Sequence, residues 1–245
     1  MQPGIRAGKA LSKTEWLALC SRAIFDFFKW DVQSEDHSVL ADFPILVETS
    51  TAEFLEDTAE QLAREALAAE KEILNHPNLV TKLRLPRKIV QALQIGSGPE
   101  CSPNAGVRVM RFDFHFTSEG WRISEVNADV PGGFIESSGW NKLFAASVPG
   151  ATIPVNTSEL YCGAVRAAIG SGGAVAMVHA TAYSDDRQVM QHLAHCLSAQ
   201  GLTVHAASPA HIAWTSGSQQ RWRFRSLALS RNARINAAVS SLHLD

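Results

Sequence analysis

The chain has 245 residues, of which 46% are hydrophobic and 19% are charged, and its formal net charge is −2. These values are typical of a globular protein with one large or two small domains, and they argue against nucleic-acid binding through a general positive field. The sequence contains no run of about 18 apolar residues that would cross a membrane, and its N-terminus lacks the apolar segment of a secretory signal. We therefore expect a cytoplasmic protein.

The N-terminal third of the chain is predicted to be helical. Ser12 or Thr14 can cap a helix that continues to about Lys29. A longer helix is predicted from about residue 50 to Pro77, because its apolar residues recur at steps of four and three and form one stripe. A shorter helix should follow Pro86 and end at the glycines around residue 97.

From Val107 the hydrophobic pattern changes to alternation, which predicts a β-hairpin. With Ser118-Glu119-Gly120 as a three-residue loop, the glycine takes the left-handed position that such loops favour. Asp113 then lies opposite Glu125 and Arg111 opposite Asn127, all on one face, with opposed Cβ atoms about 5 Å apart. A two-residue loop would shift the register by one residue and separate the two acids onto opposite faces.

The second half of the chain has the pattern of an α/β domain. Helices are predicted over about 134–144 and 158–169. A strand over 174–180, a helix over 185–200 and a strand over 202–207 then form a βαβ unit with parallel strands. The fold class is therefore α+β / α/β, with a helical and hairpin region over 1–150 and a partial α/β region over 151–245.

Cysteine usage gives no sign of a disulfide framework or a structural zinc site. The four cysteines lie far apart and form no Cys-x-x-Cys pair: Cys20, Cys101, Cys162 and Cys196. His192, His195 and Cys196 are close on a predicted helix, but no acid stands at ligand spacing, so no zinc is expected there. Free thiols in a reducing cytosol are the expectation.

The polar face of the hairpin carries the strongest chemical signal. Two close carboxylates repel each other unless a cation lies between them, and Mg²⁺ takes one or two carboxylates together with nucleotide phosphate oxygens. The Asn127 amide can add a neutral ligand, and Arg111 offers a fork for a phosphate or a carboxylate. On spacing alone, a solvated face whose acids are neutralised by Arg111 is the simpler interpretation.

The motif residues resemble a known family. The segments Arg111-Phe-Asp113 and Glu125-Val-Asn127-Ala-Asp129-Val-Pro131, followed by Glu136, are similar to the synthetase part of glutathionylspermidine synthase and to the pre-ATP-grasp region of its relatives. Eukaryotic glutathione synthetase shows a looser version. The resemblance implies an ATP-grasp fold and an ATP- and Mg²⁺-dependent ligase that joins a carboxylate to an amine through an acyl phosphate.

By motif position, the resemblance assigns roles to individual residues. Asp113, Glu125 and Asn127 would hold Mg²⁺, and Arg111 would steady the phosphoryl group or acyl phosphate. The segment after Asn127 would line the substrate pocket, with five residues singled out: Asp129, Gly132, Gly133, Glu136 and Ser137.

The same resemblance sets the expected domain roles and partners. Residues 1–150 would form the helical and hairpin part of an ATP-grasp-like ligase domain, and residues 151–245 a partial, truncated, substrate-side pre-ATP-grasp-like domain. The expected partners are a small-molecule or peptide carboxylate and an amine, with neither nucleic acid nor membrane. Two alternatives stay open, namely a non-catalytic remnant that binds a metal, a peptide or another protein, and a chain whose fold a partner chain completes.

Overall fold

The computed structural model describes residues 4–96, 108–128, 132–153, 155–170, 172–180, 182–215, 221–224 and 237–240. The chain forms two compact units: unit 1 comprises Met1–Ala7 and Ile45–Ala128, and unit 2 comprises Gly8–Pro44 and Asp129–Asp245. In the described part, no helix combines the length and the apolar character needed to span a membrane. The functional division near residue 150 stays a prediction.

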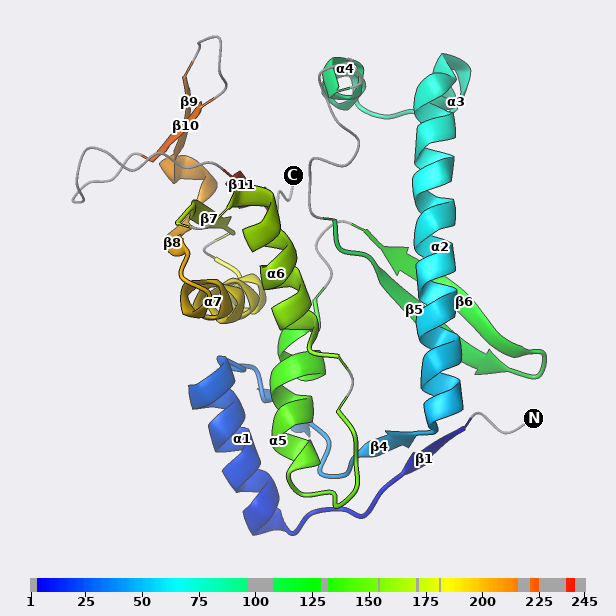
Figure 1. The fold of residues 1–245 in the computed structure, drawn as a ribbon, viewed down its shortest axis with the longest axis vertical. Coiled ribbons are helices and arrows are strands. Elements are labelled where there is room, and N and C mark those ends of the chain that lie inside the picture. Colours follow the sequence, from blue (N-terminus) through cyan, green and yellow to red (C-terminus); the bar gives the residue numbers. More distant parts are fainter. Residues whose placement is uncertain are drawn as a thin grey trace. The chain divides into compact units, whose positions relative to one another are not determined.

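Unit 1 contains a long helix and two small antiparallel sheets (Figure 1). Strand β1 (Ile5–Ala7) pairs with β4 (Ile45–Val47), and helix α2 (Thr49–Asn75) follows directly. The chain continues through α3 (Pro77–Lys82) and α4 (Arg87–Gly96). The predicted helices before Pro77 and after Pro86 are therefore confirmed, and proline at the first position of α3 fits the preference for proline at a helix start.

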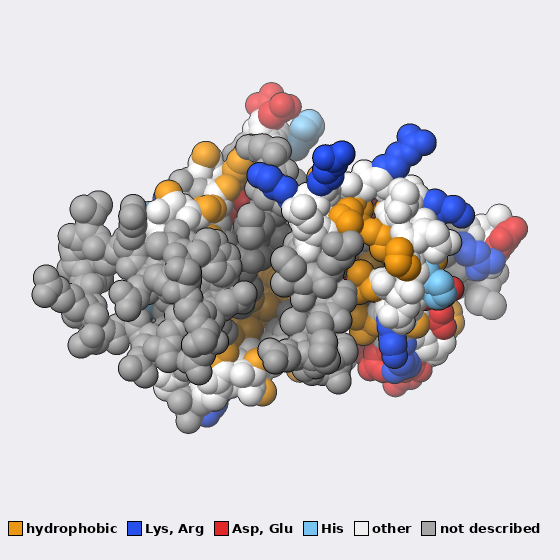
Figure 2. All heavy atoms as spheres, turned by 90° about the horizontal axis from the view of Figure 1, so that it is seen from above, with side chains coloured by type: hydrophobic (Ala, Val, Ile, Leu, Met, Phe, Trp, Pro, Cys, Tyr) orange, Lys and Arg blue, Asp and Glu red, His pale blue; other side chains and the backbone are white. Residues whose placement is uncertain are grey.

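Hydrophobic side chains of unit 1 stay at the surface. No residue of α2 is buried, and Phe54, Leu67 and Leu83 are about half exposed. In Figure 2 such side chains lie at the surface with Lys and Arg side chains beside them. Helix α2 is amphipathic, but its apolar stripe is only partly covered.

The second sheet of unit 1 is the predicted hairpin, formed by β5 (Arg111–Thr117) and β6 (Gly120–Asn127). Thr117 pairs with Gly120, so the loop has two residues and the predicted three-residue loop is wrong. The Thr117 hydroxyl donates to the Gly120 carbonyl at 2.8 Å and accepts from the Glu119 amide at 3.2 Å. These bonds hold the tight turn closed.

Unit 2 begins with helix α1 (Lys13–Phe27), whose start is fixed by a capping box between Ser12 and Glu15. The short strands β2 (Gln33–Ser34) and β3 (His37–Ser38) follow. Helix α1 contacts a π-helix, η1 (Ile135–Trp140), and α5 (Asn141–Ala145). The core at this contact consists of Cys20, Ala23, Leu40 and Leu143. The region predicted as a helix over 134–144 is thus helical, with a π-helical first part.

The α/β part of unit 2 confirms the predicted βαβ unit. It comprises α6 (Thr157–Ile169), β7 (Ala174–Val178), α7 (Ser184–Ala199) and β8 (Thr203–Ala207). Strands β7 and β8 are parallel, and β11 (Ala237–Ser240) lies parallel to β7 on its other side. All five residues of β7 are buried, as the central strand of such a sheet requires.

Three short elements lie in the described residues between β8 and β11. A 3₁₀ turn, η2 (Pro209–His211), leads into β9 (Ile212–Thr215), which pairs with β10 (Arg221–Phe224) in an antiparallel ribbon.

Two glycines of unit 2 give opposite expectations for stability. A Cβ on Gly139 of η1 would lie 2.5 Å from the Phe27 ring and 3.0 Å from its Cβ, whereas one on Gly163 of α6 would meet nothing within 4 Å. We expect Gly139→Ala to lower the free energy of unfolding by about 1–3 kcal/mol through overpacking. Gly163→Ala should raise it by about 0.5–1 kcal/mol, because alanine loses less backbone entropy in a helix.

Urea unfolding followed by circular dichroism measures both changes. Equal effects of the two substitutions would contradict the close contact between η1 and α1.

Candidate functional site

A β-bulge brings the predicted residues of the hairpin together. From the turn, the register runs regularly to Phe114 opposite Ile123, and it then shifts so that Asp113 lies opposite Glu125. Ser124 is the extra residue, and its hydroxyl donates to the Asp113 carbonyl at 3.2 Å. The predicted pairing of the two acids therefore holds, although the loop has two residues, because the bulge restores the lost residue.

The bulge also determines which side chains of β6 share a face of the hairpin. On the turn side of the bulge, Phe116 pairs with Trp121, and their rings pack edge to face at 5.2 Å. Beyond the bulge, Arg111 pairs with Asn127. Simple alternation along β6 would place Trp121 on the same face as Glu125, but the extra residue between them places the two side chains on opposite faces.

Arg111 and Asp113 form a two-pronged ion pair along β5. The Arg111 Nε lies 2.8 Å from Asp113 Oδ1, and one terminal nitrogen lies 3.1 Å from Oδ2. This hydrogen bonding lowers the pKa of Asp113 and raises that of Arg111, and the nearby charge of Glu125 contributes to the latter shift. The arginine therefore acts as the cation that keeps the two acids together.

The oxygen atoms of this face fit a hard cation only in part. Asp113 and Glu125 supply carboxylates and Asn127 an amide oxygen, a donor set that Mg²⁺ completes with water or phosphate oxygens. Among the described residues, no group of three His, Cys, Asp or Glu side chains is arranged to hold a metal. The face can thus supply part of a magnesium coordination shell, and a phosphate ligand would have to supply the rest.

Unit 2 contains a pocket of about 300 Å³ that includes three of the other predicted residues. Gly132, Gly133 and Glu136 line it. Ser137 is not among the lining residues, and its hydroxyl lies 2.6 Å from that of Thr157. Asp129 lies outside the described residues.

The pocket is rich in carboxylates. Four acids line it together with one lysine: Asp31, Glu136, Asp185, Asp186 and Lys29. Four negative charges and one positive charge give a formal sum of −3. Asp185 and Asp186 stand in the first turn of α7, where the helix dipole favours negative charge. A cation is therefore the ligand that this pocket favours electrostatically.

Lys29 neutralises one side of the pocket. Its side chain is 4% exposed, and its Nζ lies 2.8 Å from Asp31 Oδ1 and 2.5 Å from Glu136 Oε1. Burial alone would lower the pKa of Lys29, but the two carboxylates together outweigh burial and raise it. Asp185 and Asp186 have no such partner among the ion pairs of the described residues.

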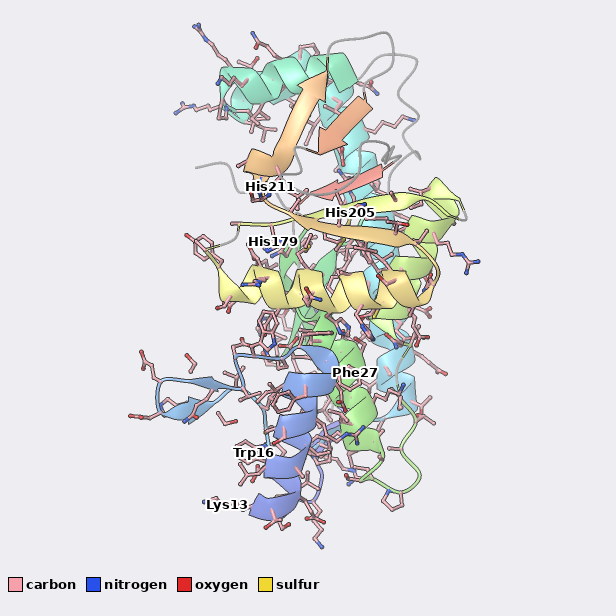
Figure 3. The ribbon with its side chains drawn as sticks, turned by 90° about the vertical axis from the view of Figure 1, so that its left-hand side faces the viewer. Lys13, Trp16, Phe27, His179, His205 and His211 are labelled. Atoms are coloured by element: carbon pink, nitrogen blue, oxygen red, sulfur yellow. The ribbon has the colours of Figure 1, made fainter. Side chains whose placement is uncertain are left out.

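The segment after α1 directs Lys29 into this pocket. Phe28 ends the helix in the left-handed conformation at φ 65°, an uncommon state for a residue other than glycine. The Trp30 amide donates to the Gln188 side chain of α7 at 2.9 Å, and the guanidinium of Arg187 stacks over the Trp30 ring. Figure 3 shows Phe27 at the end of α1 that meets α7.

Sequence reasoning singled out Glu136 but not Lys29 or the other three acids of this pocket. A helix was predicted over 185–200 and another to about Lys29, but no site role was assigned to Lys29, Asp185 or Asp186. A local signal was available in the clustering of two acids after Tyr183. The contact between Lys29 and Glu136 joins residues far apart in the chain, so no local pattern indicates it.

The pairing of Arg111 with Asp113 predicts a pH effect. The pKa of Asp113 lies below its ordinary value of 3.8, so the ion pair is present above that pH and is lost as the pH falls through the lowered pKa. In Arg111→Met, the pKa of Asp113 should return toward 3.8, as measured by carboxyl ¹³C NMR titration. Arg122→Met, which removes the ion pair with Glu119 on the same hairpin, should leave Asp113 unchanged; an equal shift in both variants would contradict the assignment.

Comparison with known proteins identifies the family of the chain. A family described as glutathionylspermidine synthase preATP-grasp matches residues 11–229 of the 245, which includes both the hairpin and the pocket. A search of curated proteins gave no match. The chain belongs to the glutathionylspermidine synthase preATP-grasp family.

Proposed function

We propose that this protein takes part in ATP- and Mg²⁺-dependent ligation of a carboxylate to an amine. The observation that carries the proposal is the bulged hairpin, which collects Arg111, Asp113, Glu125 and Asn127 on one face. Family membership supports a ligase of this class. We further propose that the hairpin is part of an ATP-grasp arrangement.

The hairpin residues have complementary roles in this reaction. Asp113, Glu125 and Asn127 would hold magnesium, which supplies charge neutralisation at the transferring phosphoryl group. Arg111 would leave Asp113 when that carboxylate binds the metal, and its fork would then bind a phosphate or acyl phosphate oxygen. The ion pair with Asp113 thus keeps the arginine and the carboxylate close together before substrates bind.

The pocket of unit 2 is the proposed site for the amine. Lys29 already pairs with Asp31 and Glu136, which leaves Asp185 and Asp186 as the anions available to an ammonium group. Gly132 and Gly133 present backbone without side chains at the pocket wall. An amine substrate would enter protonated, be held by the carboxylates, and lose a proton before attack on the activated carboxylate.

A non-catalytic binding role is the second candidate. Both oxygens of Asp113 already accept hydrogen bonds from Arg111, so the charge of Asp113 is compensated without a metal. A protein that only binds a metal or a peptide would not need Arg111 to leave Asp113 during a reaction. Turnover decides between the two functions.

The first test follows ATP-dependent activation of the acid. We expect the full chain with MgATP and glutathione, the acid in the family description, to release ADP and to form a hydroxamate when hydroxylamine replaces the amine. Glu125→Gln and Asp113→Asn should reduce the rate by about 100-fold, the scale of losing one group that stabilises the transition state. Glu119→Gln, in the turn of the same hairpin, is the matched control and should retain the wild-type rate.

Each other outcome has a defined meaning. ADP release that is equal in Glu119→Gln and Glu125→Gln would exclude the hairpin from catalysis. Saturable magnesium binding without ADP release would favour the non-catalytic role.

The second test separates the amine site from the phosphoryl site. Asp185→Asn and Asp186→Asn remove a negative charge each, so the KM for spermidine should rise about tenfold or more, the scale of a lost charge-assisted contact. Hydroxamate formation, which needs no amine, should stay at the wild-type rate. Asp36→Asn, in the β2–β3 turn, serves as the control. An unchanged KM in both pocket variants would contradict the placement of the amine.

A further inference from the structure

Helices α6 and α7 present a buried group of polar and sulfur side chains to each other. Helix α6 contributes Ser158 and Cys162, and helix α7 contributes His192 and Cys196. In each helix the two residues are four apart and therefore lie on one face. Neither the hairpin nor the carboxylate pocket uses these side chains.

The distances join these side chains into one cluster. The Ser158 hydroxyl lies 2.9 Å from His192 Nε2, and Cys196 Sγ lies 4.0 Å from the same nitrogen. The Cys162 thiol points at α7, with its Sγ 3.9 Å from the Leu193 carbonyl, one turn before Cys196. Each thiol is also the main influence on the pKa of the other, as expected for two sulfurs that face each other between the helices.

Exposure decides which member of the cluster can react. Ser158 is 1% exposed, His192 4% and Cys162 0%, so a substrate cannot reach the serine and histidine. Cys196 is only partly buried. Cys196 is therefore the member of the cluster that is most open to a small reagent.

The surroundings make the two thiols unequal. The hydrogen bond from Cys162 lowers the pKa of Cys196; burial opposes this shift, and His192 and His195 add to it. The same hydrogen bond, together with burial, raises the pKa of Cys162. The arrangement therefore favours a thiolate at Cys196 and a thiol at the more deeply buried Cys162, which is typical of a reactive cysteine beside a resolving cysteine.

We infer that Cys196 is a redox-reactive cysteine that a hydroperoxide oxidises, and that Cys162 resolves it to a disulfide between α6 and α7. The Cys196 thiolate attacks one peroxide oxygen, the O–O bond breaks, and hydroxide leaves and takes up a proton. Cys196 is then a sulfenic acid. The Cys162 sulfur loses its proton and attacks the Cys196 sulfur, so that an S–S bond forms, the S–O bond breaks and water leaves.

The overall reaction consumes two thiols and one hydrogen peroxide and gives one disulfide and two waters. The two sulfurs must approach to about 2 Å for this bond to form. Rotation of the two side chains and movement of the contacting helices α6 and α7 would bring them together. Zinc binding is not an alternative, because no metal-binding group of three such side chains exists among the described residues.

The experiment uses the full chain with Cys101→Ser, since Cys101 lies outside the described residues. The reduced protein is treated with hydrogen peroxide, digested and analysed by mass spectrometry. We expect a peptide pair linked through Cys162 and Cys196, reversed by dithiothreitol. In Cys162→Ala, Cys196 should stop at the sulfenic acid, which dimedone traps.

Alkylation with iodoacetamide at pH 6 gives a second readout that needs no change at the cluster. Cys196 should react at least about tenfold faster than Cys20, a scale set by the larger thiolate fraction. Cys20 is the matched internal control, because it is buried and burial raises its pKa. The inference is overturned if Cys196 reacts no faster than Cys20, or if peroxide links no disulfide or a different pair.

Discussion

The single extra residue in β6 determines what the hairpin can do. Without the shift at Ser124, the two-residue turn would pair Asp113 with Ser124 and leave Glu125 on the other face. With it, two carboxylates lie opposite each other, an arrangement that is unfavourable on its own by about 0.2–1 kcal/mol. Arg111 removes this penalty by binding both oxygens of Asp113. The bulge therefore brings the two carboxylates together, and Arg111 supplies the positive charge that makes their proximity tolerable.

The carboxylate pocket of unit 2 uses the same principle with a different cation. Lys29 is buried and pairs with two acids, as a compact ammonium can. Its position depends on the left-handed Phe28 and on the bond between the Trp30 amide and Gln188. In each unit a fixed cation leaves some acid groups available for a ligand, namely Glu125 in the hairpin and Asp185 and Asp186 in the pocket.

The sequence predicted the elements better than their connections. The helices α1, α2, α4, α6 and α7 and the parallel pair β7–β8 follow from apolar spacing, caps and glycines, which are local signals. The pairing of Asp113 with Glu125 was predicted correctly, but the three-residue loop from which it was derived was wrong. The loop is one residue shorter than expected and the bulge adds that residue back, so the two differences cancel in the register beyond the bulge.

The features that the sequence did not reveal depend on non-local contacts. Helix α1 packs against η1 and α5, more than 100 residues further along the chain, where Gly139 allows Phe27 to approach closely. The Lys29–Glu136 contact and the facing of Cys162 with Cys196 likewise join distant segments. Each of these contacts is made by a single residue of a common type. The spacing of residues in the sequence does not distinguish such a residue from one at the surface.

Paramagnetic NMR with Mn²⁺, used as a substitute for Mg²⁺, tests most directly whether the bulged face holds a divalent cation. The full chain is titrated with Mn²⁺ in the presence of ATP, and a variant with one alanine inserted after Ser124 is compared with one that carries the alanine in the Ser118-Glu119 turn. The account predicts saturable broadening centred on Asp113, Glu125 and Asn127 in the wild type and the turn variant. The insertion after Ser124 should abolish it, because the insertion turns Glu125 to the opposite face. Broadening centred elsewhere, or equal broadening in both insertion variants, would contradict the account.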